Sequence, residues 1–227
     1  MSPTKEKTQV ISRKRVTDHG EVYTAEREVS AMLDLVKHET ERIDSRFLEP
    51  ACGTGNFLAP ILERKLAVVK RKYGKSQIEF ERYAIVATGS IYGVDILEDN
   101  VEYCRGRLFT IFDDIYTALH KKKSKDSYRD AIRFVLGRNI LWGDALSLKT
   151  VDSKSAPIIF SEWSLARGSM IKRRDYQFFD LAEFDPKKPS LFSRREKSDT
   201  GETVFSPQPM KEFSLIHYSS LGHENTI

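Results

Sequence analysis

The chain has 227 residues, of which 40% are hydrophobic and 31% are charged, proportions that are ordinary for a globular protein. Its net charge of +4 is mildly basic, which is compatible with nucleic-acid binding but does not indicate it. No apolar run approaches the roughly 20 residues that a membrane-spanning helix needs, and the polar N-terminus has no signal-peptide core. We therefore expect an intracellular, cytoplasmic protein without a membrane partner.

The two cysteines, Cys52 and Cys104, are neither paired in a Cys-x-x-Cys motif nor close to a pair of histidines. This spacing argues against a zinc site and against a disulfide framework. We expect two small buried thiols and no bound metal.

The N-terminal region begins with polar sequence and then acquires helical periodicity. Residues 1–16 are rich in Lys, Arg, Ser and Thr, which predicts a flexible basic arm. A turn-like segment over 17–25 follows, and Thr24 is a candidate N-cap for a helix over about 25–40. Residues 42–48 then predict a first, short buried strand.

The segment from 59 to 160 alternates between helical and strand patterns. The expected helices cover 59–73, 96–119 and 127–137, and the expected strands cover 90–95, 139–145 and 157–160. Residues 79–88 fit a helix or a strand, because their apolar periodicity does not decide between the two. The alternation predicts an α/β fold with an open, mainly parallel sheet that carries helices on both faces.

Beyond residue 165 the regular alternation fades. Prolines and many Ser, Lys and Arg residues indicate loops around short strands at 203–205 and 214–218. We therefore divide the chain into an arm (1–16), an α/β domain (17–164) and an irregular basic extension (165–227) that would complete the sheet.

The first strand passes into a helix through a loop that contains Gly53 and Gly55. Glycine permits positive φ and close approach of the backbone, so such a loop places N–H groups around a small-molecule site. A dinucleotide fingerprint does not fit, because Leu58 stands where the third glycine would be, and the Gly-Lys-Ser/Thr of a phosphate loop is absent. Glu49, just before the loop, would repel a pyrophosphate but suits a ligand that presents a positive amino group.

Three expected strands each end in an acid, namely Glu49, Asp95 and Asp144. In a parallel sheet the carboxyl ends of the strands lie at one edge, where ligands bind in this architecture. Each acid taken alone is better explained as a helix N-cap. Three acids at successive strand ends, the first of them joined to a glycine loop, indicate a ligand site.

Four segments carry a family resemblance: HGEVYTAE (19–26), FLEPACGTGNFL (47–58), IYGVDI (91–96) and NILWGDAL (139–146). Together they resemble the N-terminal half of bacterial adenine-specific DNA methyltransferases of restriction–modification systems. That family uses S-adenosylmethionine on a Rossmann-like sheet, and the resemblance covers roughly residues 15–160. It therefore implies this fold, this cofactor and DNA as the substrate.

The resemblance also implies roles for individual residues. Asp95 would bind the ribose hydroxyls of the cofactor and Asp144 its adenine amino group, with Ile96 and Ala145 or Leu146 beside the adenine ring. Around the methionine part, the family pattern places Tyr23, Thr24, Glu49, Ala51, Gly53, Gly55, Asn56 and Phe57. Apolar residues at helix starts are equally often plain core, so Ile96 and Ala145 keep that alternative.

The sequence departs from the family where the target amine would be held. Family members carry Asp or Asn, two prolines and an aromatic residue after the fourth strand, and this chain has Ser161, Glu162 and Trp163 there instead. Ser161 or Glu162 could hydrogen-bond an amine, and Trp163 could stack on a flipped-out base. A packed tryptophan at the end of a strand is the alternative.

The basic residues Lys172, Arg173 and Arg174 are candidates for contacts to DNA, with a solvated loop as the alternative. Because the chain is short for the family, target selection would depend on a separate specificity or partner subunit or on sequence that is missing here.

Three hypotheses for the function follow from these patterns. The first is an S-adenosylmethionine-dependent, adenine-specific (N6) DNA methyltransferase or its modification subunit. The second is a catalytically inactive subunit that binds the cofactor and regulates a partner. The third is methylation of another substrate, such as RNA or protein, with Glu162 as the polar group.

Overall fold

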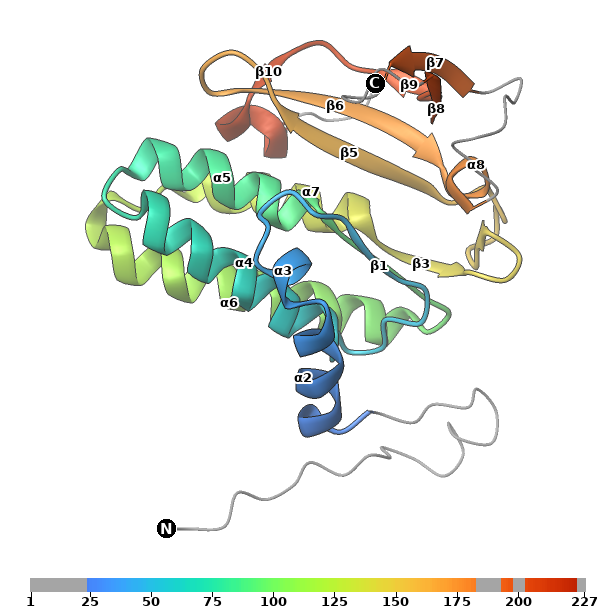
Figure 1. Ribbon diagram of the computed structural model, residues 1–227, viewed down its shortest axis with the longest axis horizontal. Coiled ribbons are helices and arrows are strands. Elements are labelled where there is room, and N and C mark those ends of the chain that lie inside the picture. Colours follow the sequence, from blue (N-terminus) through green and yellow to red (C-terminus); the bar gives the residue numbers. More distant parts are fainter. Residues whose placement is uncertain (1–23, 183–192, 198–202, 224–227) are drawn as a thin grey trace.

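A computed structural model describes residues 24–182, 193–197 and 203–223 (Figure 1). The predicted arm and Tyr23 lie outside the described residues. The fold is mixed α/β with a mainly parallel four-stranded sheet, in the order β1-β2-β3-β4. Among the described residues, no helix combines the length and apolar character that crossing a bilayer requires.

The first predicted helix is divided in two. Helix α2 (Glu26–Leu35) ends at Val36, whose φ of −116° and ψ of 30° are not helical, and α3 (Lys37–Thr40) adds one further turn. The prediction of Thr24 as the N-cap is wrong, because Ala25 occupies that position and no side chain caps the helix. The chain begins its helix one residue later than the sequence suggested.

The central part of the chain follows the predicted alternation closely. Its helices are α4 (Leu58–Tyr73), α5 (Gln77–Gly89), α6 (Glu98–His120) and α7 (Asp126–Asn139), with a short 3-10 turn, η1 (Lys121–Lys123), after α6. Its strands are β1 (Phe47–Glu49), β2 (Ile91–Asp95), β3 (Ile140–Asp144) and β4 (Lys149–Thr150). The undecided segment is helix α5, and α7 continues past Gly137, which the sequence predicted as its end.

The parallel sheet separates two apolar clusters. Along β2, Ile91 packs into the larger cluster, which α4 to α7 fill, and Gly93 leaves room there for Leu58. Tyr92 and Val94 point to the opposite face and pack with Phe160 and other residues of a smaller cluster. This alternation along β2 is the period-2 pattern of a strand buried on both faces.

The second face of the parallel sheet is covered mainly by strands. After β4 the chain forms β5 (Ile159–Leu165), β6 (Met170–Gln177), α8 (Phe178–Ala182), β7 (Ser193–Lys197), β8 (Thr203–Pro207), β9 (Lys211–Glu212), β10 (Ile216–His217) and the 3-10 turn η2 (Tyr218–His223). Strand β6 pairs antiparallel with β5, β9 and β10, while β7 and β8 pair only with each other in the described part.

Three expectations are corrected by this second sheet. The fourth strand does not extend the parallel sheet, because β5 pairs with β6. The C-terminal extension therefore builds a separate sheet instead of completing the first. The face of Tyr92 and Val94 packs on β5 and on Phe178 of the short helix α8, where we expected longer helices.

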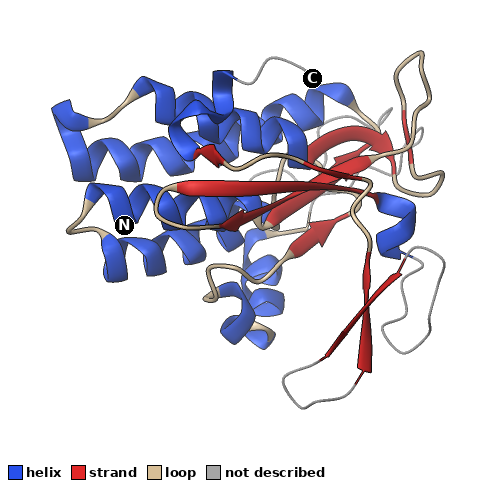
Figure 2. Cartoon of the chain, turned by 90° about the horizontal axis from the view of Figure 1, so that it is seen from above, coloured by secondary structure: helices blue, strands red, loops and turns tan. Residues whose placement is uncertain are grey.

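The long helices and the strands of the parallel sheet occupy different ends of the molecule. Figure 2 shows the long helices side by side at one end, and Figure 1 shows β5 and β6 of the second sheet extending across α5 and α7. Helix α5 leads into β2 and α7 leads into β3 with at most one residue between them. The carboxyl ends of β2 and β3 therefore point away from the helical end.

Candidate functional site

The three predicted acids lie at the carboxyl ends of adjacent parallel strands. Glu49 ends β1 opposite Gly93 of β2, and Asp95 ends β2 opposite Trp142 of β3. Asp144 is the last residue of β3. The sheet order β1-β2-β3 thus brings the acids to one edge, as the sequence predicted.

The glycine loop has the backbone geometry that the sequence predicted. Gly53 has a φ of 50° and Gly55 a φ of 83°, both in the region that favours glycine. A side chain at Gly55 would place its Cβ 2.9 Å from the Sγ atom of Cys104. Neither position accepts a larger residue without strain, and the close approach to α6 adds a steric reason at Gly55.

Asp95 holds this loop in place. Its buried carboxylate accepts hydrogen bonds from the backbone N–H of Gly53 at 2.7 Å and of Leu97 at 2.9 Å, and from the side chain of Asn100 at 3.2 Å. Both carboxylate oxygens are therefore engaged by protein donors. A ribose hydroxyl would have to share or displace these bonds, so Asp95 acts here first as a positioning residue for the loop.

Glu49 and Asp144 differ in what surrounds their carboxylates. Burial raises the pKa of Glu49, and the backbone N–H of Ala51 at 3.4 Å opposes that shift. Asp144 accepts the backbone N–H groups of Leu146 and Ser147, and these bonds lower its pKa. Asp144 thus stabilises the turn over residues 145–148, and the helix-cap alternative is wrong for it because β4 follows that turn. Glu49 is a partly desolvated acid that a cationic group would stabilise.

Apolar side chains are exposed beside two of the acids. Ile96 is 47% exposed and Leu146 is 95% exposed, next to Asp95 and Asp144 respectively. The indole N–H of Trp142 donates to the backbone carbonyl of Ile96 at 3.0 Å. Exposed apolar groups at this edge suit a flat apolar ligand ring better than they suit water.

Apart from Ala51, which is exposed, the other predicted cofactor residues that the structure describes are partly or fully buried. The side chain of Asn56 accepts a hydrogen bond from Arg107 at 2.9 Å, and Phe57 packs against the main core. Ala145 packs against the smaller cluster, which is the plain core role that the sequence left open. Thr24 precedes α2, and Ala51 lies in the turn that follows Glu49.

Comparisons with protein-family models, with curated proteins and with solved structures find no match for this chain. The described residues also contain no cluster of three or more His, Cys, Asp or Glu side chains that could hold a metal ion. The candidate site is therefore defined by its own geometry: three strand-end acids, a glycine loop and two exposed apolar side chains.

Two of the three predicted catalytic residues are buried. The hydroxyl of Ser161 is fully buried and donates to Asp175 at 2.7 Å. Trp163 is 5% exposed and packs between Gly89 of α5 and Phe134 of α7, 6.0 Å from the latter ring. Trp163 also lines a cavity of about 550 Å³, and its stacking on a flipped base stays a prediction. The packed-tryptophan alternative fits the structure.

Glu162 is partly buried and faces open space. Its carboxylate pairs with Arg46, lies 3.6 Å from Arg174 and accepts the Tyr176 hydroxyl at 3.2 Å. It lines two cavities, of about 490 and 550 Å³, that also share Arg46 and Tyr92. The first cavity lies between the two sheets, beside Leu48 of β1. Glu162 is thus a neutralised acid at the boundary of two hollows.

The three predicted DNA contacts are engaged within the protein. Lys172 pairs with Glu212 at 3.0 Å, and Arg174 lies 3.4 Å from the same carboxyl group. Arg173 is buried and pairs with Asp175 at 2.8 Å. These cations connect β6 to β9 and to the buried Asp175, and their contact with DNA stays a prediction.

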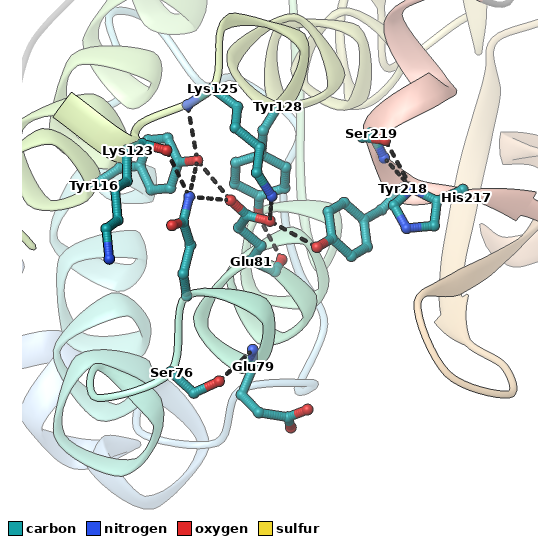
Figure 3. Close-up of polar contacts among 11 residues, drawn as sticks. Ser76, Glu79, Glu81, Tyr116, Lys123, Lys125, Tyr128, His217, Tyr218 and Ser219 are labelled. Atoms are coloured by element: carbon teal, nitrogen blue, oxygen red, sulfur yellow. Dashed lines mark hydrogen bonds and ion pairs between the residues drawn. The ribbon is translucent and has the colours of Figure 1, made fainter. Parts of the chain in front are cut away.

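The sequence did not predict a buried acid at Glu81. Figure 3 shows its carboxylate among the hydroxyls of Tyr116 and Tyr218, both at 2.6 Å, and the ammonium of Lys125 at 2.9 Å. Burial alone would raise the pKa of Glu81, but these bonds together lower it. The cluster joins α5, α6 and the C-terminal turn η2. The sequence feature that could have indicated this buried acid is a charged residue close to the apolar residues Phe80 and Ala84.

Proposed function

We propose that this chain is an S-adenosylmethionine-dependent, adenine-specific (N6) DNA methyltransferase or its modification subunit, with a Rossmann-like cofactor domain. The observation that carries the proposal is the hydrogen bond from the loop N–H of Gly53 to Asp95, which joins the glycine loop of β1 to the acid of β2. Such a loop beside strand-end acids is the arrangement that the family resemblance implies for this cofactor.

The residues present fit the cofactor in charge and in polarity. Glu49 is a partly desolvated acid that an α-amino group would stabilise. Ile96 and Leu146 supply exposed apolar surface for an adenine ring. The cofactor, when bound, supplies an electrophilic methyl group to the exocyclic amine of a target adenine. Glu49 would hold the amino end and the loop the adjoining part, while Asp95 keeps the loop in register.

Glu162 is the residue of this chain that would accept a hydrogen bond from the target amine. It is the one member of the predicted catalytic set whose side chain lines the cavity between the sheets, next to Tyr92 and Phe160. A carboxylate accepts hydrogen bonds from an amine, and the adjacent aromatic rings suit a planar base. Arg46 and Arg174 pair with Glu162 and hold its carboxylate at this cavity.

A second function is favoured by a specific observation. Because Ser161 and Trp163 are buried and β5 belongs to a separate antiparallel sheet, the part of the site that would hold the amine differs from the family pattern. These features favour a subunit that binds the cofactor without transferring the methyl group. The third hypothesis, methylation of RNA or protein, shares Glu162 with the first and differs only in substrate.

Binding of S-adenosylmethionine, measured by isothermal titration calorimetry, tests the part that the first two functions share. We expect Glu49→Gln to weaken binding about 10- to 100-fold, the effect of losing a charged hydrogen bond. Glu63→Gln makes the same chemical change at an exposed position of α4 and should leave affinity unchanged. An unmodified protein that does not bind the cofactor contradicts both functions.

Transfer of a radiolabelled methyl group to unmethylated genomic DNA separates the functions. We expect N6-methyladenine as the product, and loss of transfer in Glu162→Gln with retained cofactor binding. Cofactor binding without transfer, also in the presence of neighbouring gene products, identifies the second function. Transfer to RNA or protein in place of DNA identifies the third.

A further inference from the structure

The helical end of the molecule carries two clusters of cations that the candidate site does not use. Residues 70–75, at the end of α4, contain four Lys or Arg, and residues 121–125, after α6, contain four Lys. All eight side chains are exposed. We call these two segments the basic end.

The two segments lie side by side. Helices α4 and α6 pack against each other and both run from the strand end to the helical end (Figures 1 and 2). The side chain of Gln77, just after the first segment, donates to the backbone carbonyl of Lys123 in the second at 2.9 Å. Residues distant in sequence therefore form one continuous cationic surface.

The basic end carries an excess of positive charge that surface ion pairs do not neutralise. Neither segment contains Asp or Glu, whereas the whole chain has a net charge of +4, so the remaining residues carry a net charge of −4. In the described part of the chain, Lys125 is the one cation of the eight with an ion pair, to Glu81 at 2.9 Å. The acids nearest in sequence are already paired, Glu79 with Arg82 and Asp126 with Arg129.

Helix dipoles explain only part of this surface. Cations in the last turn of a helix interact favourably with its C-terminal carbonyls, which accounts for Lys70 to Lys72. Lys121 to Lys123 lie beyond α6, in a separate 3-10 turn. Repulsion among so many like charges is a cost that a polyanion would relieve.

We propose that the basic end binds the phosphate backbone of duplex nucleic acid without reading its sequence. The aromatic residue of this end, Tyr73, is partly buried and its ring already stacks on Tyr83 with the centroids 3.8 Å apart, which disfavours stacking on the unpaired bases of a single strand. Ile78, three residues beyond the first segment, is 55% exposed, and one such residue is too little for insertion into a membrane. Contacts between these cationic side chains and the phosphates of a duplex are the kind of interaction that fits this surface.

This surface is separate from the strand-end acids and the glycine loop, and Lys72 also lines the second cavity beside Glu162. Helix α4 has 16 residues, so its two ends are about 24 Å apart. The basic end would anchor the duplex at a distance from the strand-end acids. Its binding requires neither S-adenosylmethionine nor methyl transfer, so failure of one proposal leaves the other standing.

The test is fluorescence anisotropy of the full chain with a labelled 20-base-pair DNA of arbitrary sequence, without cofactor, between 50 and 200 mM NaCl. Seven unpaired cations allow a slope of log K against log salt of up to about −6. We expect the triple variant Lys121→Gln/Lys122→Gln/Lys123→Gln to weaken binding at least about tenfold and to reduce the slope by about 3. Lys70→Gln/Arg71→Gln/Lys75→Gln should act in the same way.

The matched control is Lys37→Gln/Lys149→Gln/Lys154→Gln, which removes three exposed cations elsewhere. It should retain most of the affinity and of the slope, and thermal unfolding should show that all variants are folded. Equal losses in the control and in the two triples overturn the proposal, because they reflect net charge alone. Absent DNA binding overturns it, as does tighter binding to single-stranded RNA or to vesicles containing phosphatidylserine.

Discussion

The carboxylate of Asp95 and the backbone N–H of Gly53, 42 residues apart in the chain, meet at 2.7 Å. This contact joins the loop after β1 to the end of β2. The same carboxylate accepts the N–H of Leu97 and the side chain of Asn100, at the start of α6. One acid thus fixes the relative positions of a glycine loop, a strand end and a helix start.

We expect Asp95→Ala to lower the free energy of unfolding by about 1–3 kcal/mol, because three donors lose a buried acceptor. Urea unfolding monitored by circular dichroism measures the change. Asp114→Ala, at an exposed position of α6, should stay within about 0.5 kcal/mol of the parent chain. Equal stability of Asp95→Ala and the parent would show that the loop does not depend on this carboxylate.

Glu81 ties the C-terminal turn to the helices through Tyr218. We expect Glu81→Gln to cost about 3 kcal/mol, the lower end for a broken buried ion pair, since Lys125 is partly exposed and can be solvated again. Glu79→Gln breaks a surface pair with Arg82 and should cost less than about 1 kcal/mol. Similar costs for the two variants, measured by thermal unfolding, would refute a special role for the buried cluster.

The lowered pKa of Glu81 predicts a loss of stability in acid. Above the ordinary value of 4.5 the carboxyl is ionised in both states, and its contribution is fully present. As the pH falls below 4.5, the unfolded chain takes up the proton first, so stability falls until the folded carboxyl is also protonated. Urea midpoints between pH 6 and pH 3 should show this fall. In Glu81→Gln the slope should be smaller.

Lys65 predicts the opposite trend in alkali. Its buried ammonium donates to the backbone carbonyls of Arg42, Ile43 and Ser45, and burial lowers its pKa from 10.5 to about 8. Above pH 8 the folded chain has lost a proton that the unfolded chain retains, so stability rises with pH.

We expect this rise to reach about 1 kcal/mol between pH 8 and 9, from about 1.4 kcal/mol per pH unit. Urea unfolding at several pH values measures it, and the range ends about one unit below the ordinary tyrosine pKa of 10.0 so that ionisation of tyrosines in the unfolded chain contributes little. Lys65→Met should abolish the rise. A rise of the same size in Lys65→Met would assign it to another group.

Two glycines in helices predict opposite effects of the same substitution. An alanine at Gly89 would place its Cβ 2.7 Å from the Trp163 ring, and we expect Gly89→Ala to cost about 1–3 kcal/mol. Gly106, inside α6, has nothing within 4 Å of that position, and Gly106→Ala should stabilise the chain by about 1 kcal/mol. Thermal unfolding measures both. A neutral Gly89→Ala would show that Trp163 is not tightly packed.

The sequence predicted those parts of the fold that depend on local patterns. Apolar runs that end in an acid located β1, β2 and β3, and the two glycines of the loop adopt the expected positive φ. These signals are local because a strand and the turn after it are specified by neighbouring residues. Residues 79–88 stayed undecided since α5 is buried on several sides, which removes the one-sided pattern of a surface helix.

The tertiary structure decided what long-range pairing controls. Strand β5 could have extended the parallel sheet, but its residues pair with β6 over seven positions, and this choice buries Ser161 and Trp163. The same pairing brings Arg174 next to Glu162 and turns the apparent basic patch into ion pairs. Nothing in the local sequence distinguishes these partners, because a strand's hydrogen-bonding groups are the same whichever neighbour it meets.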